Sequence, residues 1–155
     1  MPPSVDQTAH PPAGPSATPP IGLHLAQTAK AVSRAFDDAL AEAGGSVPTW
    51  LILISLKTRR LANQRELAEA VGIREATLTH HLNAMDADGL VTRRRDPANR
   101  RVHLVEITAA GEAAFHRLRT AAVSFDARLR SGLGEEEIAS FGRVLDRLRS
   151  NSAPR

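Results

Sequence analysis

Residues 63–108 read NQRELAEAVGIREATLTHHLNAMDADGLVTRRRDPANRRVHLVEIT, and this stretch decides the fold. Asn63 is a favourable N-cap with a glutamate three residues later, so a helix is predicted to begin there and to end at Gly72. A second helix is predicted from Arg74 to about Ala87. Two short helices joined by a tight turn form the pattern of a helix-turn-helix.

A β-hairpin is predicted directly after the second helix. Val91–Arg95 and Val102–Thr108 have strand character, and the residues between them, Asp96-Pro97-Ala98-Asn99, favour a turn. The tip of this hairpin is rich in arginine. A helix-turn-helix followed by a hairpin is the element order of a winged helix.

Helical periodicity flanks this module on both sides. We expect helices near residues 21–43, 49–58, 109–131 and 134–150. Apolar residues in the last two recur at alternating three- and four-residue spacing, which is typical of helices packing nearly parallel, within or between chains. We therefore expect a mainly α fold with a small β-hairpin wing (α+β), a winged helix-turn-helix with flanking dimerisation helices. The predicted dimerisation residues are Leu25, Phe36, Phe115, Leu118, Phe125, Phe141 and Leu145.

The domain organisation follows from length and composition. The chain has 155 residues, enough for one domain. Seven of its ten prolines lie in the first twenty residues, so residues 1–20 are expected to form a disordered tail. Residues 21–150 form the domain, with the winged-helix module at about 47–108 and dimerisation helices at about 21–43 and 109–150. Residues 151–155 are expected to fray.

Composition excludes several function classes. The chain has no cysteine, which excludes disulfides, thiolate metal sites and thiol redox sensing. It has no apolar stretch long enough to cross a membrane and no export signal, so we expect a cytoplasmic protein without membrane contact. Five aromatic residues are too few for a base-stacking platform that binds single strands. No nucleophile motif or glycine-rich phosphate loop is present, so we expect neither an enzyme nor a cofactor.

Positive charge is concentrated in the middle of the chain. The formal net charge is only +3, but residues 57–103 hold ten basic and six acidic side chains, a local balance of +4. Half of those basic residues lie between Arg93 and Arg101. Such a patch attracts a polyanion, although a solvated charged face would look the same.

Recognition helices place the exposed side chains of their first turns against base edges in the major groove. With Leu78, Leu82 and Met85 taken as buried, the outward residues are predicted to contact DNA. The candidate DNA-binding residues are Arg74, Glu75, Thr77, Thr79 and His80 on the helix, and Arg95, Arg100 and Arg101 on the hairpin.

The run Asp96-Pro97-Ala98-Asn99-Arg100-Arg101, followed by Ile107-Thr108 and Gly111, resembles the wing of the multiple antibiotic resistance regulator (MarR) family. Upstream, Gln64–Ala68, Thr77–Thr79 and Asp88–Val91 resemble the family's helix-turn-helix, and the similarity covers roughly residues 21–150.

The resemblance implies a homodimeric DNA-binding regulator, usually a repressor, which binds a pseudo-palindromic operator in double-stranded DNA. It also implies release by a small phenolic or aromatic effector. Arg101 matches the arginine that the family inserts into the minor groove. Two positions depart from the family pattern: Asn99, where an aspartate is usual, and Arg74-Glu75, where small residues are common.

Three alternatives remain open. Phe36, Trp50 and Ile54 either line an effector cavity or are ordinary core residues. The six histidines raise the possibility of a metal-responsive regulator, although no pair has the spacing of a helical zinc site. Finally, a winged helix can bind protein instead of DNA, and the arginine-rich wing argues for the duplex.

Overall fold

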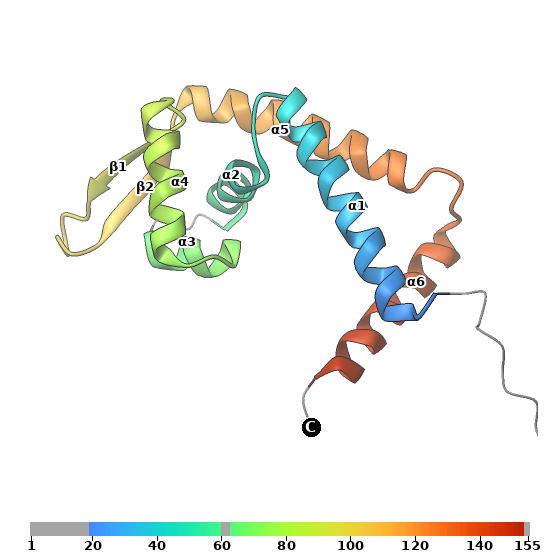
Figure 1. The fold of residues 1–155 in the computed structure, drawn as a ribbon. Coiled ribbons are helices and arrows are strands. Elements are labelled where there is room, and N and C mark those ends of the chain that lie inside the picture. Colours follow the sequence, from blue (N-terminus) through green and yellow to red (C-terminus); the bar gives the residue numbers. More distant parts are fainter. Residues whose placement is uncertain (1–18, 60–62, 154–155) are drawn as a thin grey trace, which may run out of the picture. The chain divides into compact units, whose positions relative to one another are not determined.

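The computed structural model describes residues 19–59 and 63–153. Within these residues it is mostly helical, with one two-stranded antiparallel sheet, which confirms the predicted fold class. The elements, labelled in Figure 1, are α1 (Ile21–Glu42), α2 (Val47–Arg59), α3 (Gln64–Val71), α4 (Glu75–Ala87), β1 (Val91–Arg95), β2 (His103–Ile107), α5 (Ala109–Leu129) and α6 (Glu135–Ser152).

The chain divides into two units, one ending at Arg34 and one beginning at Ala35. The described part of the first unit is the N-terminal part of α1, where Leu25 and Val32 are half-buried and Ile21 and Leu23 are exposed. The predicted tail, residues 1–20, lies outside the described residues except for its last two. All other elements belong to the second unit.

The helix-turn-helix forms as predicted (Figure 1). Asn63 caps α3, and its side-chain oxygen accepts the N–H of Glu66 at 2.9 Å. Gly72 ends the helix in the left-handed region, at φ 76°, where a side chain would be strained. The second helix begins one residue later than predicted, because Arg74 keeps an extended backbone and serves as the N-cap of α4.

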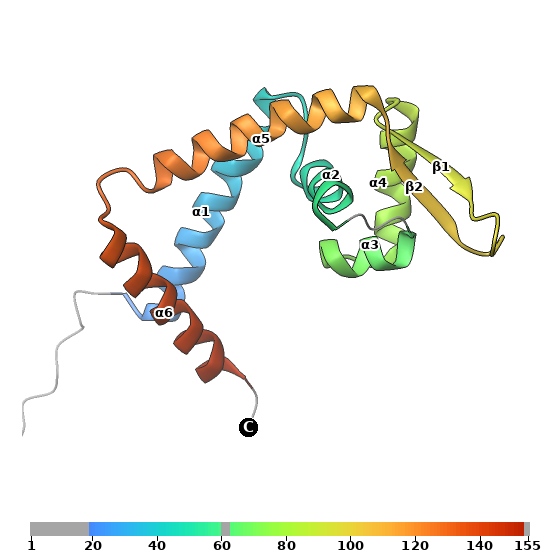
Figure 2. The same cartoon turned by 180° about the vertical axis from the view of Figure 1, so that it is seen from behind.

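The hairpin follows α4 and contacts it along β1 (Figure 2). Val91 pairs with Ile107 and Arg95 with His103. β2 is one residue shorter at each end than predicted. Val102 is used in the turn, where its N–H donates to the Asn99 carbonyl at 2.8 Å, and Thr108 caps α5 by accepting the N–H of Gly111 at 3.0 Å.

The core of the second unit is centred on α2. Ile52 and Leu53 are fully buried, and Trp50 stacks on Phe115 of α5 at 5.6 Å between ring centroids. No single helix in the described ranges is long and apolar enough to cross a membrane, and α1 and α2 meet both conditions only when they are taken together across the bend between them. The apolar character of α2 follows from its place in this core.

Three predicted dimerisation residues on α5 lie in the interior of a single chain instead. Leu118 is 1% exposed and packs against Gly45, where an added Cβ would collide with it. Phe115 is buried against Trp50, and Phe125 packs on Phe36 at 5.1 Å. The prediction that these three side chains face another subunit is wrong, because α2 and the end of α1 already cover them.

The end of α5 and the whole of α6 carry exposed apolar side chains. Phe141 is 59% exposed, Leu133 is 52% exposed, and α6 has no buried residue. α6 also continues to Ser152, two residues further than predicted, so the expected fraying from residue 151 is wrong for residues 151 and 152. Residues 154 and 155 lie outside the described residues.

Candidate nucleic-acid interface

The outer face of α4 is the first part of the candidate interface. Leu78, Leu82 and Met85 point into the core, as predicted. The opposite face is exposed and consists of Ala76, Thr77, His80, Asn83, Ala84 and Ala87. Because the alanines are small, His80 and Asn83 are the longest polar side chains near the middle of this face. Arg74 and Glu75 are also exposed, at the start of the helix.

Thr79 lies differently from its expected outward position. It is half-buried, and its hydroxyl donates to the Glu75 carbonyl at 2.9 Å and accepts from Nε2 of Gln64. Both contacts hold α4 in place, the second by joining it to α3. The structure therefore engages the hydroxyl of Thr79 within the helix-turn-helix instead of presenting it to a partner.

The three consecutive arginines of β1 have three different surroundings. Arg93 donates from Nε and Nη2 to one carboxylate oxygen of Asp86 on α4, at 3.3 and 3.2 Å. Arg94 makes an ion pair with Glu106 on β2 at 2.6 Å. Arg95, by contrast, has no carboxylate within 4.0 Å in the part of the chain that the structure describes, and it is exposed.

The tip of the wing is shaped by two side chains that accept from the backbone. Asp96 accepts the N–H of Ala98 at 2.8 Å, and Asn99 accepts the N–H of Arg101 at 3.2 Å. At the position where the family pattern has an aspartate, Asn99 therefore keeps a hydrogen bond to the tip. Arg100 and Arg101 are exposed, and among residues 19–59 and 63–153 neither makes an ion pair.

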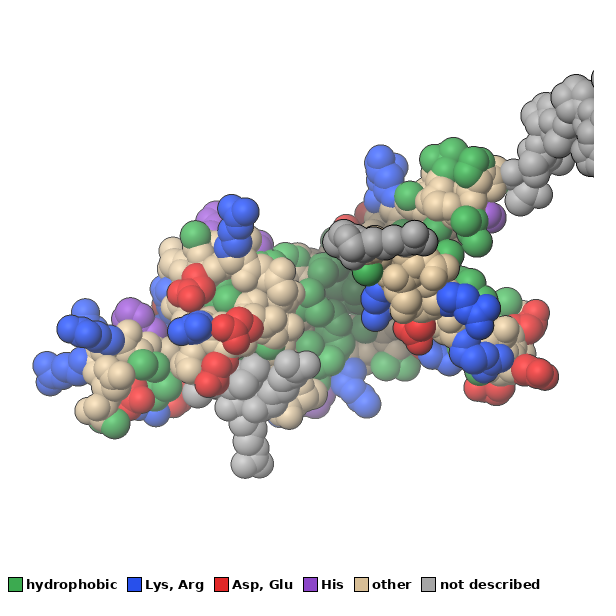
Figure 3. Space-filling model, turned by 90° about the horizontal axis from the view of Figure 1, so that it is seen from below, with side chains coloured by type: hydrophobic (Ala, Val, Ile, Leu, Met, Phe, Trp, Pro, Cys, Tyr) green, Lys and Arg blue, Asp and Glu red, His purple; other side chains and the backbone are tan. Residues whose placement is uncertain are grey.

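Lys, Arg and His side chains gather at the end of the molecule that carries the hairpin, with carboxylates among them (Figure 3). Because Asp86 and Glu106 are held by Arg93 and Arg94, the hairpin arginines that make no ion pair within the described residues are Arg95, Arg100 and Arg101, and these can attract a polyanion.

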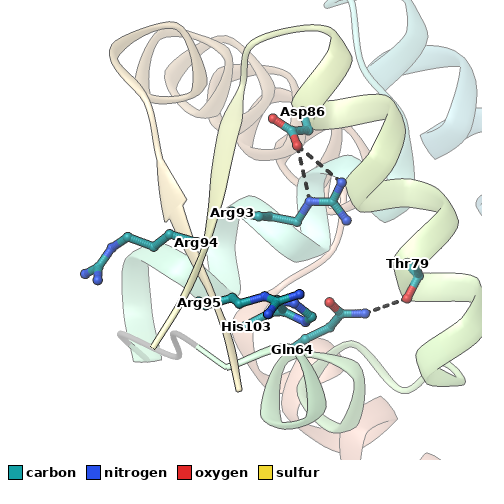
Figure 4. Close-up of a pocket in the computed structure, with 7 residues that line it drawn as sticks. All are labelled: Gln64, Thr79, Asp86, Arg93, Arg94, Arg95 and His103. Carbon is teal, nitrogen blue, oxygen red and sulfur yellow. Dashed lines mark hydrogen bonds and ion pairs between the residues drawn. The ribbon is translucent and has the colours of Figure 1, made fainter. Parts of the chain in front are cut away.

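Two hollows lie between the hairpin and the helix-turn-helix, and each is lined by residues of both. The first has a volume of about 530 Å³, and Figure 4 shows its lining: Gln64, Thr79, Asp86, Arg93, Arg94, Arg95 and His103. The second, of about 430 Å³, is lined by Asn63, Gln64, Arg65, Glu75, Arg101, Val102 and His103. Gln64 and His103 border both hollows.

The candidate DNA-binding residues predicted from the sequence did not include Gln64, Asn83 or His103. Asn83 was detectable, since it lies one turn beyond His80 on the predicted outer face. His103 was also detectable, because the turn length fixes the hairpin register and so places it opposite Arg95. The position of Gln64 depends on how α3 crosses α4, which no local pattern gives.

The three residues considered for an effector cavity pack among apolar neighbours. Trp50 is 9% exposed against Phe115, Phe36 lies on Phe125, and Ile54 is half-buried. These contacts favour the alternative that they are core residues.

For metal binding, no group of three His, Asp or Glu side chains within the described ranges is arranged to hold an ion. His80 and His81 lie 5.7 Å apart with their rings at 63° to each other. His24 and His116 are both exposed.

Comparison with known proteins gives consistent matches. The model of the MarR family matches residues 46–103. The HTH-type transcriptional regulator YdgJ of Bacillus subtilis is 30% identical over 89 residues, which are 57% of this chain and 54% of YdgJ, so the match spans about half of that relative's length.

Solved structures match over more of the chain. The crystal structure of transcriptional regulator PA3341 is 32% identical with a TM-score of 0.68, covering 84% of this chain and 96% of that one. The transcriptional repressor CouR, solved bound to a 23-mer DNA duplex, is 24% identical with a TM-score of 0.74, covering 84% and 92%. The matched proteins are transcriptional regulators, which confirms the prediction of a regulator and not an enzyme. The chain belongs to the MarR family of winged helix-turn-helix transcriptional regulators.

Proposed function

We propose that this chain is a homodimeric repressor that binds a pseudo-palindromic operator in duplex DNA. The outer face of α4 enters the major groove, and the wing contacts the adjacent minor groove and backbone. The observation that carries the proposal is a set of exposed hairpin arginines beside the exposed face of α4, Arg95, Arg100 and Arg101, which make no ion pair with any residue that the structure describes.

The chemistry of these residues suits a duplex. Arginine inserted into a narrow minor groove is favoured by the negative potential there, and this is the role we give to Arg101. His80 and Asn83, and at the helix start Arg74, Glu75 and Thr77, are placed to meet base edges. Of the residues predicted from the sequence, only Thr79 moves from a DNA-contacting role to a positioning role. The DNA-bound structure of CouR supports the docking mode.

A homodimer is supported by the exposed apolar side chains of α5 and α6. The exposed fractions of these side chains, Val123, Leu129, Leu133, Phe141 and Val144, lie between 44% and 59%, which is more apolar surface than one helical hairpin ordinarily leaves in water. We assign these residues, together with Leu25 and the half-buried Leu145, to the surface shared by two copies. The two α4 helices would then lie about 34 Å apart, one turn of DNA.

We also propose that a small phenolic or aromatic effector releases the protein from DNA and that the protein acts in the cytoplasm, where its operator lies. Family membership supports both statements. A panel of phenolic acids, tested for release of bound duplex in a gel-shift assay, tests the first.

The experiment that tests DNA recognition is selection of bound duplexes from a random-sequence pool, followed by measurement of the salt dependence of binding. We expect a two-fold symmetric site and a log–log slope of several units, since each neutralised phosphate contributes about −0.9. If no sequence is enriched and binding does not depend on salt, the winged helix serves a protein partner and the proposal fails.

A further inference from the structure

Arg95 and His103 face one another across the hairpin at the mouth of the larger hollow. They are partners in the β1–β2 register, and both side chains are exposed. Figure 4 shows them between the strands and the first turn of α3, with Arg94 pointing away on the other side of the hairpin. Directly opposed residues in an antiparallel pair lie about 5 Å apart at their Cβ atoms, close enough for both side chains to bind one ligand.

Of the arginines that line this hollow, Arg95 alone is without a carboxylate within 4.0 Å in the described part of the chain, because Arg93 is held by Asp86 and Arg94 by Glu106. Its guanidinium is therefore the strongest free attraction for an anion inside the hollow.

The first turn of α3, which carries Gln64, also lines this hollow, and a contact with α4 holds it in place. The side-chain amide of Gln64 donates to Thr79, so the first turn of α3 is tied to the recognition helix beside Arg95 and His103. An anion bound between these walls would consequently fix the position of α4 relative to the backbone that carries the anion.

We propose that Arg95 and His103 together bind one backbone phosphate of the operator, with Gln64 as the positioning residue, and that His103 binds it as the imidazolium. This inference rests on the proposed function, and it adds proton uptake to DNA binding. The regulator then holds DNA more tightly as the pH falls.

A phosphate fits this position better than a neutral group. Two like charges placed directly opposite in a hairpin repel each other, and a phosphate between them replaces that repulsion with charge-assisted hydrogen bonds. Backbone phosphates receive half or more of the hydrogen bonds in protein–DNA interfaces, and they fix the register of the protein on the duplex.

Histidine is the side chain whose ordinary titration falls in the physiological range, which makes it the usual proton-sensitive group in binding sites. Apart from His103, the charged groups that border the two hollows are Arg65, Glu75, Asp86, Arg93, Arg94, Arg95 and Arg101. Asp86 makes an ion pair with Arg93. Arg65 makes an ion pair at 3.3 Å with Glu69, and Glu69 lines neither hollow. Among the residues described, Glu75 is the carboxylate that lines a hollow together with His103 and makes no ion pair.

The test uses the full chain and a short random-sequence duplex labelled with fluorescein, because a phosphate contact does not depend on base sequence. Dissociation constants are measured by anisotropy at pH 6 and pH 8 and at constant ionic strength. The proteins compared are the unchanged chain, His103→Gln, and His116→Gln as the matched control, since His116 is an exposed histidine on α5 outside the candidate interface.

We expect the unchanged chain to bind about threefold to tenfold more tightly at pH 6 than at pH 8. His103→Gln should bind with nearly the same affinity at both values and match the unchanged chain at pH 8, whereas His116→Gln should keep the pH dependence. The match at pH 8 separates loss of a proton-dependent contact from damage to the hairpin, which would weaken binding at both values.

Two results overturn the inference: equal affinity of the unchanged chain at pH 6 and pH 8, or a pH dependence that survives in His103→Gln. In both cases the duplex still binds, so the proposed function stands while the phosphate site falls. An unchanged chain that binds no duplex at either pH overturns the proposed function, and the phosphate site falls with it.

Discussion

Replacing Leu118 by alanine tests whether the apolar face of α5 belongs to the chain's own core. The side chain is 1% exposed, so the substitution removes three buried carbon atoms, a transfer cost of about 2.4 kcal/mol. α2 and the Gly45 backbone can collapse only partly into the space, and the resulting cavity raises the expected loss of unfolding free energy to about 3–4 kcal/mol. Dimer formation should be nearly unaffected, since Leu118 does not reach the surface.

The matched control is Phe141→Ala, at a side chain that is 59% exposed on α6. The free energy of unfolding of this variant should lie within about 1 kcal/mol of that of the unchanged chain when both are measured as dissociated monomers, because little buried area is lost within the protomer. The dimer dissociation constant of this variant should, however, be clearly higher than that of the unchanged chain. Urea denaturation gives the unfolding free energies, and sedimentation equilibrium gives the dimer dissociation constants. If Leu118→Ala costs less than about 1 kcal/mol and separates the subunits, the placement of Leu118 in the protomer core is wrong.

Three further substitutions test the wing and its support. Arg101→Ala should weaken operator binding by about 1–2 kcal/mol and reduce the salt slope by about 0.9, with little loss of stability; wild-type affinity in a gel-shift titration would remove the wing tip from the interface. Asp86→Asn should strengthen binding to random-sequence duplex, because the guanidinium of Arg93 is released from its carboxylate; anisotropy showing weaker binding would contradict this. Gly111→Ala should lower the thermal midpoint strongly, since the added Cβ collides with the Leu90 carbonyl oxygen; an unchanged melting curve would refute that close approach.

Features specified by neighbours in the sequence were predictable. Asn63 before a helical pattern, Gly72 after it, and the turn residues 96–99 each determine a local backbone conformation, and the helix-turn-helix and hairpin follow from them. The boundaries that moved did so by one or two residues. Arg74, for example, has the sequence spacing of a first helical residue but adopts an extended backbone as the N-cap.

Features that depend on which surfaces meet were not predictable. The alternating three- and four-residue spacing on α5 shows that Leu118 is on an apolar face, but the same spacing results whether that face packs on the chain itself or on a second copy. The same limit applies to Thr79 and Gln64, which meet only because of the angle between α3 and α4. The ion pairs of Arg93 and Arg94 also join residues of different elements, so charge counting alone overstated the free positive charge of the wing.

Footprinting of a selected duplex with dimethyl sulfate and hydroxyl radicals tests most directly whether two copies place α4 and the wing in adjacent grooves. We predict two protected major-groove segments centred about 10 base pairs apart, each flanked by minor-groove protection that disappears in an Arg100→Ala, Arg101→Ala double variant. A single protected segment, or flanking protection that is unchanged in the double variant, would contradict the account.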